Sequence, residues 1–378
     1  MALAFLPSPL PSTLGDQVTE GRARISAGEL AIVCSRYDIG QVRSVTPIKA
    51  GSRASPKALL TTSTGVFLLK RRAAPPSGTT PADWLHRVAL SHQIVLHLAA
   101  RDLPVPALLG TRDDHNSMLQ LDEHVYELYR FVHGRAYDRT PDSARTAGRL
   151  LARCHSALRE IHPSWPPPRR SYHAHARLPA VLRSLHTLLN DPALLVTATD
   201  LADRYDRASA AANAAGLPLQ PDQLIHGDWH PGNLLWTQPS PPSPPSEVAA
   251  ILDFDTVSLA PALTDAANGA LQFALRRRPI DPPLPPTKAP FSVAFDLGLF
   301  GAFWAGYRDA EPVATLSWPA AAIPFLCIEA IIAEVALPIA ATGRFGRFAA
   351  PGVLRLVART AAWFETHQES LVTRATNP

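Results

Sequence analysis

The sequence predicts an α+β protein with two lobes, the first built mainly from antiparallel strands and the second mainly from helices. Apolar and polar side chains alternate from Gln41 to Arg72, as they do in half-buried strands. After Pro141 the apolar positions recur every three to four residues, which is typical of amphipathic helices. The length of 378 residues, of which 46% are hydrophobic, is enough for two lobes of roughly 100–200 residues each.

The first lobe should begin with three strands, VRSVTPI, ALLTTST and VFLLKRR, separated by turns at Gly51 and at Thr64-Gly65. A helix is expected from about Asp83 to Arg101, followed by strands around 117–121 and 125–132. These elements divide the chain into four parts: an N-terminal arm at 1–40, a sheet-rich lobe at 41–125, a hinge at 126–134 and a helical lobe at 135–378.

Composition excludes several classes of protein. The three cysteines lie far apart, which argues against a disulfide framework and favours a reducing, cytoplasmic setting. The net charge of +4 is too small to indicate a nucleic-acid partner. The apolar run from Ala320 to Ala341 contains two glutamates and two prolines, so we expect a buried helix and no membrane span. The first residues lack a basic region and contain prolines, so no signal peptide is expected.

The strongest chemical signal is the segment LIHGDWHPGNLL at 224–235, followed by AILDFD at 250–255. In both segments apolar strand residues flank polar side chains of catalytic type. Asp228 and Asn233 are five residues apart, the spacing found in the catalytic loop of protein kinases, and Asp253 begins a segment like their D-F-G. The two segments therefore indicate phosphoryl transfer, in which the protein mainly holds the reacting groups in line.

On these motifs the chain resembles the protein-kinase-like small-molecule phosphotransferases, which include aminoglycoside phosphotransferases, choline kinases and kinase-fold homoserine kinases. The resemblance implies a two-lobed protein-kinase-like fold and transfer of the γ-phosphate of ATP, with Mg²⁺, to a hydroxyl group of a small molecule. Homoserine is the leading acceptor, because the segments Leu103–Pro106 and Tyr126–Gly134 resemble that branch. An aminoglycoside or an amino alcohol such as choline remains open, and the sequence does not indicate a protein partner or an oligomeric state.

The same resemblance implies roles for the residues of the catalytic segments. Asp228 would accept the proton of the acceptor hydroxyl, and His226 would orient the loop through hydrogen bonds. Asn233 and Asp253 would ligate Mg²⁺, a hard cation that prefers oxygen ligands. Asp265, in the segment LTDAA, is expected to support the loop structurally.

Nucleotide-binding residues are expected in the first lobe. Lys70 resembles the strand lysine that holds the α- and β-phosphates, and Leu68 would share its face of the strand and cover adenine. Gly51 and Ser52, which stand where kinases carry a glycine-rich loop, are candidates for phosphate contact.

The hinge and the helix supply further expected contacts with the nucleotide. Backbone groups near Glu127, Leu128 and Tyr129 would hydrogen-bond the adenine edge. The helix glutamate that normally pairs with the strand lysine is missing, and Gln93 is expected there as a neutral partner without charge assistance.

Two alternatives remain open. Gln93 and the single glycine of the loop would also fit a catalytically weak nucleotide-binding pseudokinase or regulatory module. A metal hydrolase could use His226, Asp228 and His230 as ligands, although Gly227 argues for a loop at this position.

Three further polar residues of the second lobe lie in apolar helical stretches. His155 is expected to be a packed or capping histidine. Glu329 and Glu334 are candidates for the acceptor pocket, and at least one of the two should meet solvent because they point in different directions on a helix.

Overall fold

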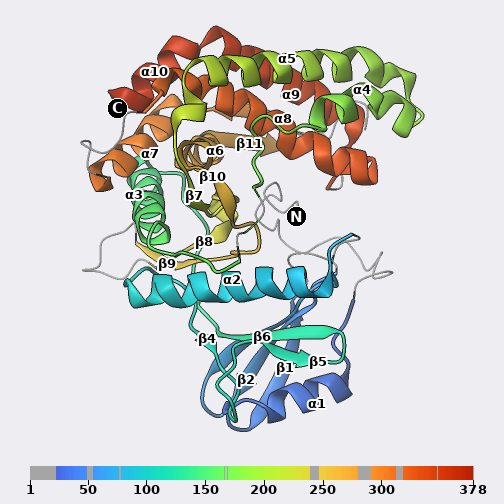
Figure 1. Cartoon of the computed structure of the whole chain (residues 1–378), viewed down its shortest axis with the longest axis vertical. Coiled ribbons are helices and arrows are strands. Elements are labelled where there is room, and N and C mark those ends of the chain that lie inside the picture. Colours follow the sequence, from blue (N-terminus) through green and yellow to red (C-terminus); the bar gives the residue numbers. More distant parts are fainter. Residues whose placement is uncertain are drawn as a thin grey trace.

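The structure is a computed structural model that describes residues 23–48, 54–75, 78–165, 167, 169–238, 247–279, 291–311, 318–346 and 348–377. It has the expected α+β architecture, in which a small sheet-rich lobe joins a larger helical lobe (Figure 1).

The first lobe is an antiparallel sheet, and the strands that the sequence predicted between residues 41 and 72 are confirmed. Its strand order is β1-β2-β3-β6-β4, and β5 also pairs with β6. The register places Lys70 of β3 opposite Glu127 of β6, and Lys57 of β2 opposite Lys70. The strands are β1 (Val42–Ile48), β2 (Lys57–Thr62), β3 (Val66–Arg71), β4 (Leu108–Leu109), β5 (Leu119–Leu121) and β6 (His124–Arg130).

Helix α1 (Ala27–Ser35) covers one face of this sheet, within the segment that the sequence analysis placed in an N-terminal arm. Val33 of the helix is buried in one cluster with Leu60 and Leu69 of the sheet. Ser26 and Glu29 form a capping box, a helix-start signal that is visible in the sequence. Residues 27–35 are therefore part of the first lobe, because their apolar side chains complete its core.

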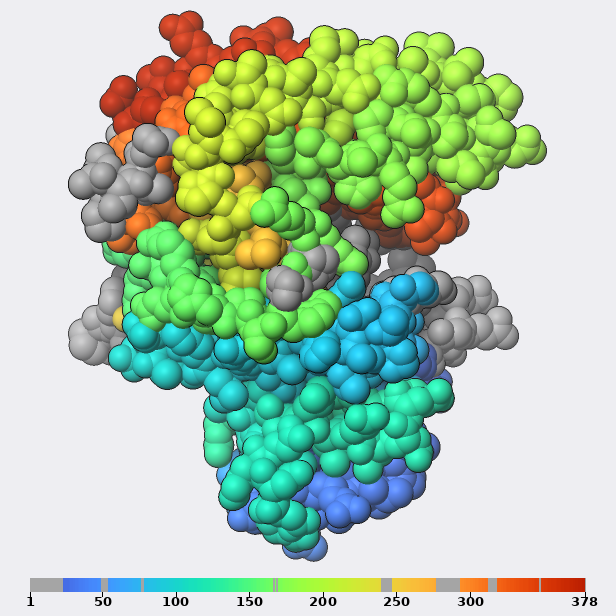
Figure 2. Space-filling model, viewed as in Figure 1, coloured from blue at the N-terminus to red at the C-terminus, as the bar shows by residue number. Residues whose placement is uncertain are grey.

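Helix α2 (Pro81–Ala100) lies between the two lobes (Figure 1). Thr80 caps its start and Pro81 occupies its first turn, where a missing backbone N–H costs nothing. Its buried apolar side chains Leu90, Ile94, Val95 and Leu98 belong to the hydrophobic core of the second lobe. The space-filling view shows α2 in contact with that lobe along much of its length (Figure 2).

Helices dominate the second lobe, as the spacing of apolar residues predicted. Helices α3 and α7 pack so closely that a Cβ on Gly148 would lie 1.9 Å from the carbonyl oxygen of Phe303. The helices are α3 (Pro141–Leu158), α4 (Leu178–Leu188), α5 (Leu195–Ala214), α6 (Ala262–Ala274), α7 (Leu297–Ala310), α8 (Ile323–Thr342), α9 (Ala350–Thr366) and α10 (Gln368–Thr376).

The described residues of the second lobe also form four strand pairs, β7 with β10, β8 with β9, β11 with β12 and β13 with β14. Their bounds are β7 (Asp222–Ile225), β8 (Leu234–Trp236), β9 (Val248–Ile251), β10 (Ser258–Pro261), β11 (Leu275–Pro279), β12 (Phe291–Phe295), β13 (Arg344–Phe345) and β14 (Phe348–Ala349).

In the described ranges, one helical segment, Ala320–Thr342, is long and apolar enough to cross a membrane. Of its most apolar window, 72% is buried inside the protein. Helix α8, which makes up most of this segment, therefore packs as a core helix, as the sequence analysis expected.

Candidate active site

Two strand pairs bring the two catalytic segments side by side. Strand β7 pairs with β10 and β8 pairs with β9, so the loop between β7 and β8 lies next to the loop between β9 and β10. The backbone N–H of Leu252 donates to the carbonyl oxygen of Asn233 at 2.8 Å, and the Thr256 hydroxyl donates to that of His226 at 3.0 Å. The polar residues of both segments therefore form one site.

Asp265 holds the first loop, as the sequence analysis predicted. Its carboxylate accepts hydrogen bonds from the backbone N–H groups of His226 at 2.9 Å and Gly227 at 3.2 Å. The fully buried ring of His155 contacts the same carboxylate at 3.0 Å, so the prediction of a packed histidine is also confirmed. Gly227 has a φ of +77° and passes close to Thr256, which explains why a glycine stands there.

His226 is a structural residue of the loop. Its Nδ1 accepts a hydrogen bond from the backbone N–H of Asp228 at 3.3 Å, and its Nε2 donates to the carbonyl oxygen of Leu252 at 3.1 Å. With both ring nitrogens engaged, it has no free lone pair for a metal. Across the described ranges, no three His, Cys, Asp or Glu side chains are grouped as metal ligands. This geometry argues against the hydrolase alternative.

Asp228 is the carboxylate of the loop that solvent can reach, with 27% of its side chain exposed. Burial alone would raise its pKa, but His230, whose Nε2 lies 3.5 Å from Oδ2, and the neighbouring His226 lower it. The Nδ2 group of Asn233 donates to the carbonyl oxygen of Asp228 at 2.9 Å and to its Oδ2 at 3.2 Å. Asp228 is thus a carboxylate that is ionised at neutral pH and oriented by Asn233.

Asp253 and Asn233 fit a hard divalent cation. Asp253 has a φ of +62°, and its Oδ1 is buried without a hydrogen-bond partner among the described residues. Such a buried carboxylate oxygen is costly unless a cation satisfies it. Because Nδ2 of Asn233 is used by Asp228, its Oδ1 is the atom that can serve as a second ligand. Mg²⁺ commonly takes one or two protein ligands and fills its other positions with phosphates and water.

Lys70 lies on the face of β3 that the alternation predicted. Leu68 and Lys70 are half-buried, whereas Phe67 and Leu69 are buried in the core on the other face. The Lys70 Nζ contacts Oδ2 of Asp255 at 2.8 Å, so this lysine of the first lobe reaches the second catalytic segment.

Two expectations about the nucleotide-binding residues are wrong. Gln93 is exposed, because its neighbours on α2 occupy the buried face of the helix, so it does not pair with Lys70. Glu127, Leu128 and Tyr129 lie inside the sheet, where β6 pairs with β3 on one side and with β4 on the other. Their backbone groups are therefore engaged and cannot hydrogen-bond adenine. Gly51 and Ser52 lie outside the described residues.

Glu329 of α8 differs from the expectation, whereas the partial exposure of Glu334 agrees with the prediction that at least one of the two glutamates meets solvent. Glu329 is fully buried, and its carboxylate accepts hydrogen bonds from the backbone N–H of Ala174 and the Ser209 hydroxyl and contacts His173. It is thus a structural residue and cannot reach a substrate. Glu334 is half-buried and accepts a hydrogen bond from the side-chain amide of Gln272.

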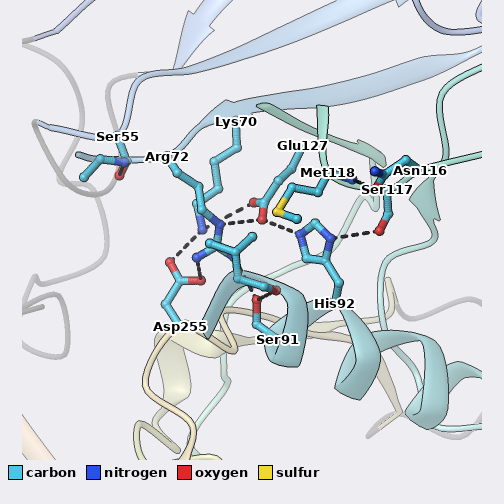
Figure 3. Close-up of polar contacts among 12 residues, drawn as sticks. Ser55, Lys70, Arg72, Ser91, His92, Asn116, Ser117, Met118, Glu127 and Asp255 are labelled. Atoms are coloured by element: carbon cyan, nitrogen blue, oxygen red, sulfur yellow. Dashed lines mark hydrogen bonds and ion pairs between the residues drawn. The ribbon is translucent and has the colours of Figure 1, made fainter. Parts of the chain in front are cut away.

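Three side chains beside Lys70 were not predicted from the sequence. Arg72, His92 and the carboxylate of Glu127 meet beside Lys70 and Asp255 (Figure 3). Arg72 could have been predicted from the sequence, because it follows Lys70 by two positions and so lies on the same face of the extended chain.

Fold and site together define a two-lobed, kinase-like protein, and comparison with known proteins agrees with this class. The model of the phosphotransferase enzyme family matches residues 44–289, and the chain belongs to this family. The family supports small-molecule phosphotransfer as its activity. No curated protein matches the chain.

Solved structures with the same fold cover nearly the whole chain. An aminoglycoside phosphotransferase from Alicyclobacillus acidocaldarius is 16% identical, with a TM-score of 0.58 and coverage of 95% of this chain and 97% of that one. A choline kinase from Cryptosporidium parvum is 12% identical, with a TM-score of 0.56 and coverage of 92% and 97%. A spectinomycin phosphotransferase in complex with ADP and spectinomycin is 14% identical, with a TM-score of 0.53 and coverage of 94% and 99%.

Proposed function

We propose that this protein transfers the γ-phosphate of ATP, with Mg²⁺, to a hydroxyl group of a small molecule. The observation that carries the proposal is the grouping of an ionised Asp228, the two oxygen ligands of Asn233 and Asp253, and a lysine of the opposite lobe. Phosphoryl transfer needs these parts and little covalent chemistry from the protein.

Each group has a defined task in this reaction. Asp228 orients the acceptor hydroxyl and takes its proton as the oxygen attacks the γ-phosphorus. Lys70 holds the phosphates, and Asn233 and Asp253 would hold Mg²⁺, which when bound neutralises charge on the phosphate oxygens. Leu68 lies on the same face of β3 as Lys70 and would cover the base.

The adenine edge is expected to bind just beyond β6, at residues 131–133. The backbone N–H of Phe131 donates to the carbonyl oxygen of Val66, which is the last backbone hydrogen bond between this segment and β3. Among the described residues, Val132 and His133 have no backbone hydrogen-bond partner, so their groups are available to a ligand. The complex of spectinomycin phosphotransferase with ADP supports nucleotide use by this fold.

The acceptor we propose is a hydroxyl compound that also carries nitrogen, of the amino-alcohol, homoserine or aminoglycoside type. The support is that similar structures are named as choline, ethanolamine, aminopropanol and spectinomycin phosphotransferases. One argument for the pseudokinase alternative was that Lys70 would have only the neutral Gln93 as a partner. This argument is weakened, because Lys70 has two carboxylate partners, Glu127 and Asp255.

The experiment that tests the proposal is incubation of the full chain with ATP and Mg²⁺ and a panel of acceptors: homoserine, choline, ethanolamine, aminopropanol and spectinomycin. ADP release would be followed, and the product would be identified by ³¹P NMR. We expect a phosphate monoester of at least one acceptor. Failure of the chain to bind Mg²⁺ and ATP in calorimetry would contradict the proposal.

A further inference from the structure

A buried carboxylate of the sheet stands beside the phosphate-binding lysine. Glu127 of β6 is directly opposite Lys70 in the register of the sheet, and its side chain is fully buried. Its Oε1 lies 2.5 Å from Nε of Arg72 and 2.5 Å from Nε2 of His92, and its Oε2 lies 3.8 Å from Nζ of Lys70 (Figure 3).

This carboxylate is ionised because cations surround it. Burial alone would raise the pKa of Glu127, but the charges of Arg72 and Lys70 lower it to about 2. A buried charge of this kind persists in a folded protein only when it is paired, and here two cations share it.

One oxygen of Glu127 is still available to Lys70. Oε1 accepts the hydrogen bonds from Arg72 and His92, whereas the buried Oε2 has no hydrogen-bond partner among the described residues. Buried oxygens are rarely left unpaired, so a small movement of the Lys70 ammonium toward Oε2 would complete the pair.

A second carboxylate currently shares the same cations, and its environment differs. Asp255 contacts Lys70 at 2.8 Å and Arg72 at 2.8 Å, but 38% of its side chain is exposed. Because Asp255 is exposed, the phosphates of a bound nucleotide could replace it as the partner of Lys70 and Arg72. Phosphates are also anions, so they would compete with Asp255 for these two cations. Glu127 has no such freedom, because a central strand holds its backbone.

Helix α2 reaches this cluster with a hydroxyl that accepts and a histidine ring, and not with a carboxylate. Arg72 Nη2 donates to the Ser91 hydroxyl at 2.9 Å, and His92 contacts both Glu127 and the Ser117 hydroxyl, the latter at 2.9 Å. The neighbouring Gln93 is exposed. The carboxylate beside Lys70 thus comes from strand β6, and α2 contributes His92 to it.

We propose that Glu127 is the residue that positions Lys70 for the phosphates of the nucleotide, and that α2 is coupled to this pair through His92 and Arg72. The inference rests on the proposed function, because it assigns Lys70 to a nucleotide. It follows that the sheet register, and not the placement of α2, sets the distance between the lysine and its carboxylate.

A double-mutant cycle tests this positioning role. Affinity for Mg²⁺ and ADP would be measured by calorimetry for wild type, Glu127→Gln, Lys70→Met and the double variant, with thermal unfolding as a check of folding. We expect Glu127→Gln to weaken binding about tenfold in the wild-type chain but less than about twofold in the Lys70→Met chain, because a residue that acts through another loses its effect when that residue is removed. Equal losses in both chains would overturn the inference.

Two further variants sharpen the result. Glu127→Asp keeps the negative charge but shortens the side chain by one methylene, which moves the carboxylate away from Lys70. This variant should fold even if Glu127→Gln does not. It should weaken nucleotide binding in the wild-type chain and have little effect in the Lys70→Met chain. Gln93→Glu added to Glu127→Gln should not restore binding, because residue 93 faces solvent. Restoration by Gln93→Glu would show that residue 93 can reach Lys70, and would overturn the inference that the sheet alone sets the distance between the lysine and its carboxylate.

The matched control is Glu123→Gln, the same chemical change at an exposed position of the turn before β6. It should leave nucleotide affinity within about twofold of wild type, as most exposed substitutions do. If wild type itself binds no nucleotide, the proposed function fails and the inference falls with it. If wild type binds and Glu127→Gln binds equally well, only the inference is contradicted.

Discussion

The carboxylate of Asp265 accepts a hydrogen bond from the backbone N–H of His226 at 2.9 Å, which fixes the start of the loop that carries Asp228. The same carboxylate also binds the backbone N–H of Gly227 and the ring of His155. Beyond the end of β7, the backbone N–H groups of His226 and Gly227 have no strand partner. The buried carboxylate of Asp265 on α6 satisfies them instead.

Removal of this charge should loosen the loop. Asp265→Asn places an amide N–H₂ where backbone N–H groups need an acceptor, so we expect a loss of about 2–3 kcal/mol in the free energy of unfolding, measured with urea. The exposed Asp113→Asn is the control and should stay within about 0.5 kcal/mol of wild type. Wild-type stability of Asp265→Asn would show that the loop does not depend on this carboxylate.

Asp253 should control the response to Mg²⁺. Its Oδ1 is buried and has no hydrogen-bond partner in the described part of the chain, so Asp253→Asn removes a charge that is only partly stabilised in the metal-free protein. We expect the variant to melt at or above the wild-type temperature without Mg²⁺, but to lose the extra stability that Mg²⁺ and ADP give to wild type. An unchanged response of the variant to Mg²⁺ would exclude Asp253 as a ligand.

The close packing of α3 on α7 predicts a large effect of one methyl group. A Cβ on Gly148 would lie 1.9 Å from the carbonyl oxygen of Phe303, so Gly148→Ala should destabilise the protein by about 3 kcal/mol or more. Gly28 of α1 is exposed and has no atom within 4 Å of such a Cβ. Gly28→Ala should therefore stabilise by about 0.5–1 kcal/mol. Similar changes in the two variants would contradict the packing described here.

Acid should weaken the attachment of α1 to the sheet. Burial alone would raise the pKa of Glu29, but hydrogen bonds from Tyr126, Ser26 and Arg71 lower it to about 2, from 4.5. Because the folded pKa is the lower one, the ionised group stabilises the protein above pH 4.5, and this contribution is lost as the pH falls toward 2.

The difference in stability between wild type and Glu29→Gln should follow this titration. The variant should be the less stable protein at pH 7, and the difference should shrink between pH 4.5 and pH 2 in denaturant titrations at each pH. A difference that stays constant over this range would mean that the Glu29 carboxylate is not held as the structure shows.

The catalytic segments could be predicted from the sequence because each is local. The spacing of Asp228 and Asn233, the Asp253 segment and the supporting Asp265 are all readable within short stretches of chain. The alternation around Lys70 likewise predicted its face of β3. Helix α1 was missed although Ser26 and Glu29 show the spacing of a capping box.

The partners of Lys70 could not be predicted in the same way. Glu127 reaches it only because β6 pairs with β3 in one register, a relation between distant segments. The choice of Gln93 failed because a step of one residue turns a helix by about 100°, which moves the side chain from the buried face that holds His92 into solvent. The two-residue strand β4, which engages the backbone of Leu128, is too short to give a periodic signal.

The proposed function requires Asp228 to act on the hydroxyl of a small-molecule acceptor during transfer from ATP. The most direct test is ADP release with ATP, Mg²⁺ and the acceptor panel, together with calorimetric ATP affinity, for wild type and Asp228→Asn. We predict acceptor-dependent turnover that falls by at least about 10²-fold in the variant, because a general base is lost. ATP affinity should change by less than about threefold, because Asp228 faces the acceptor. Wild-type turnover by Asp228→Asn would contradict the account.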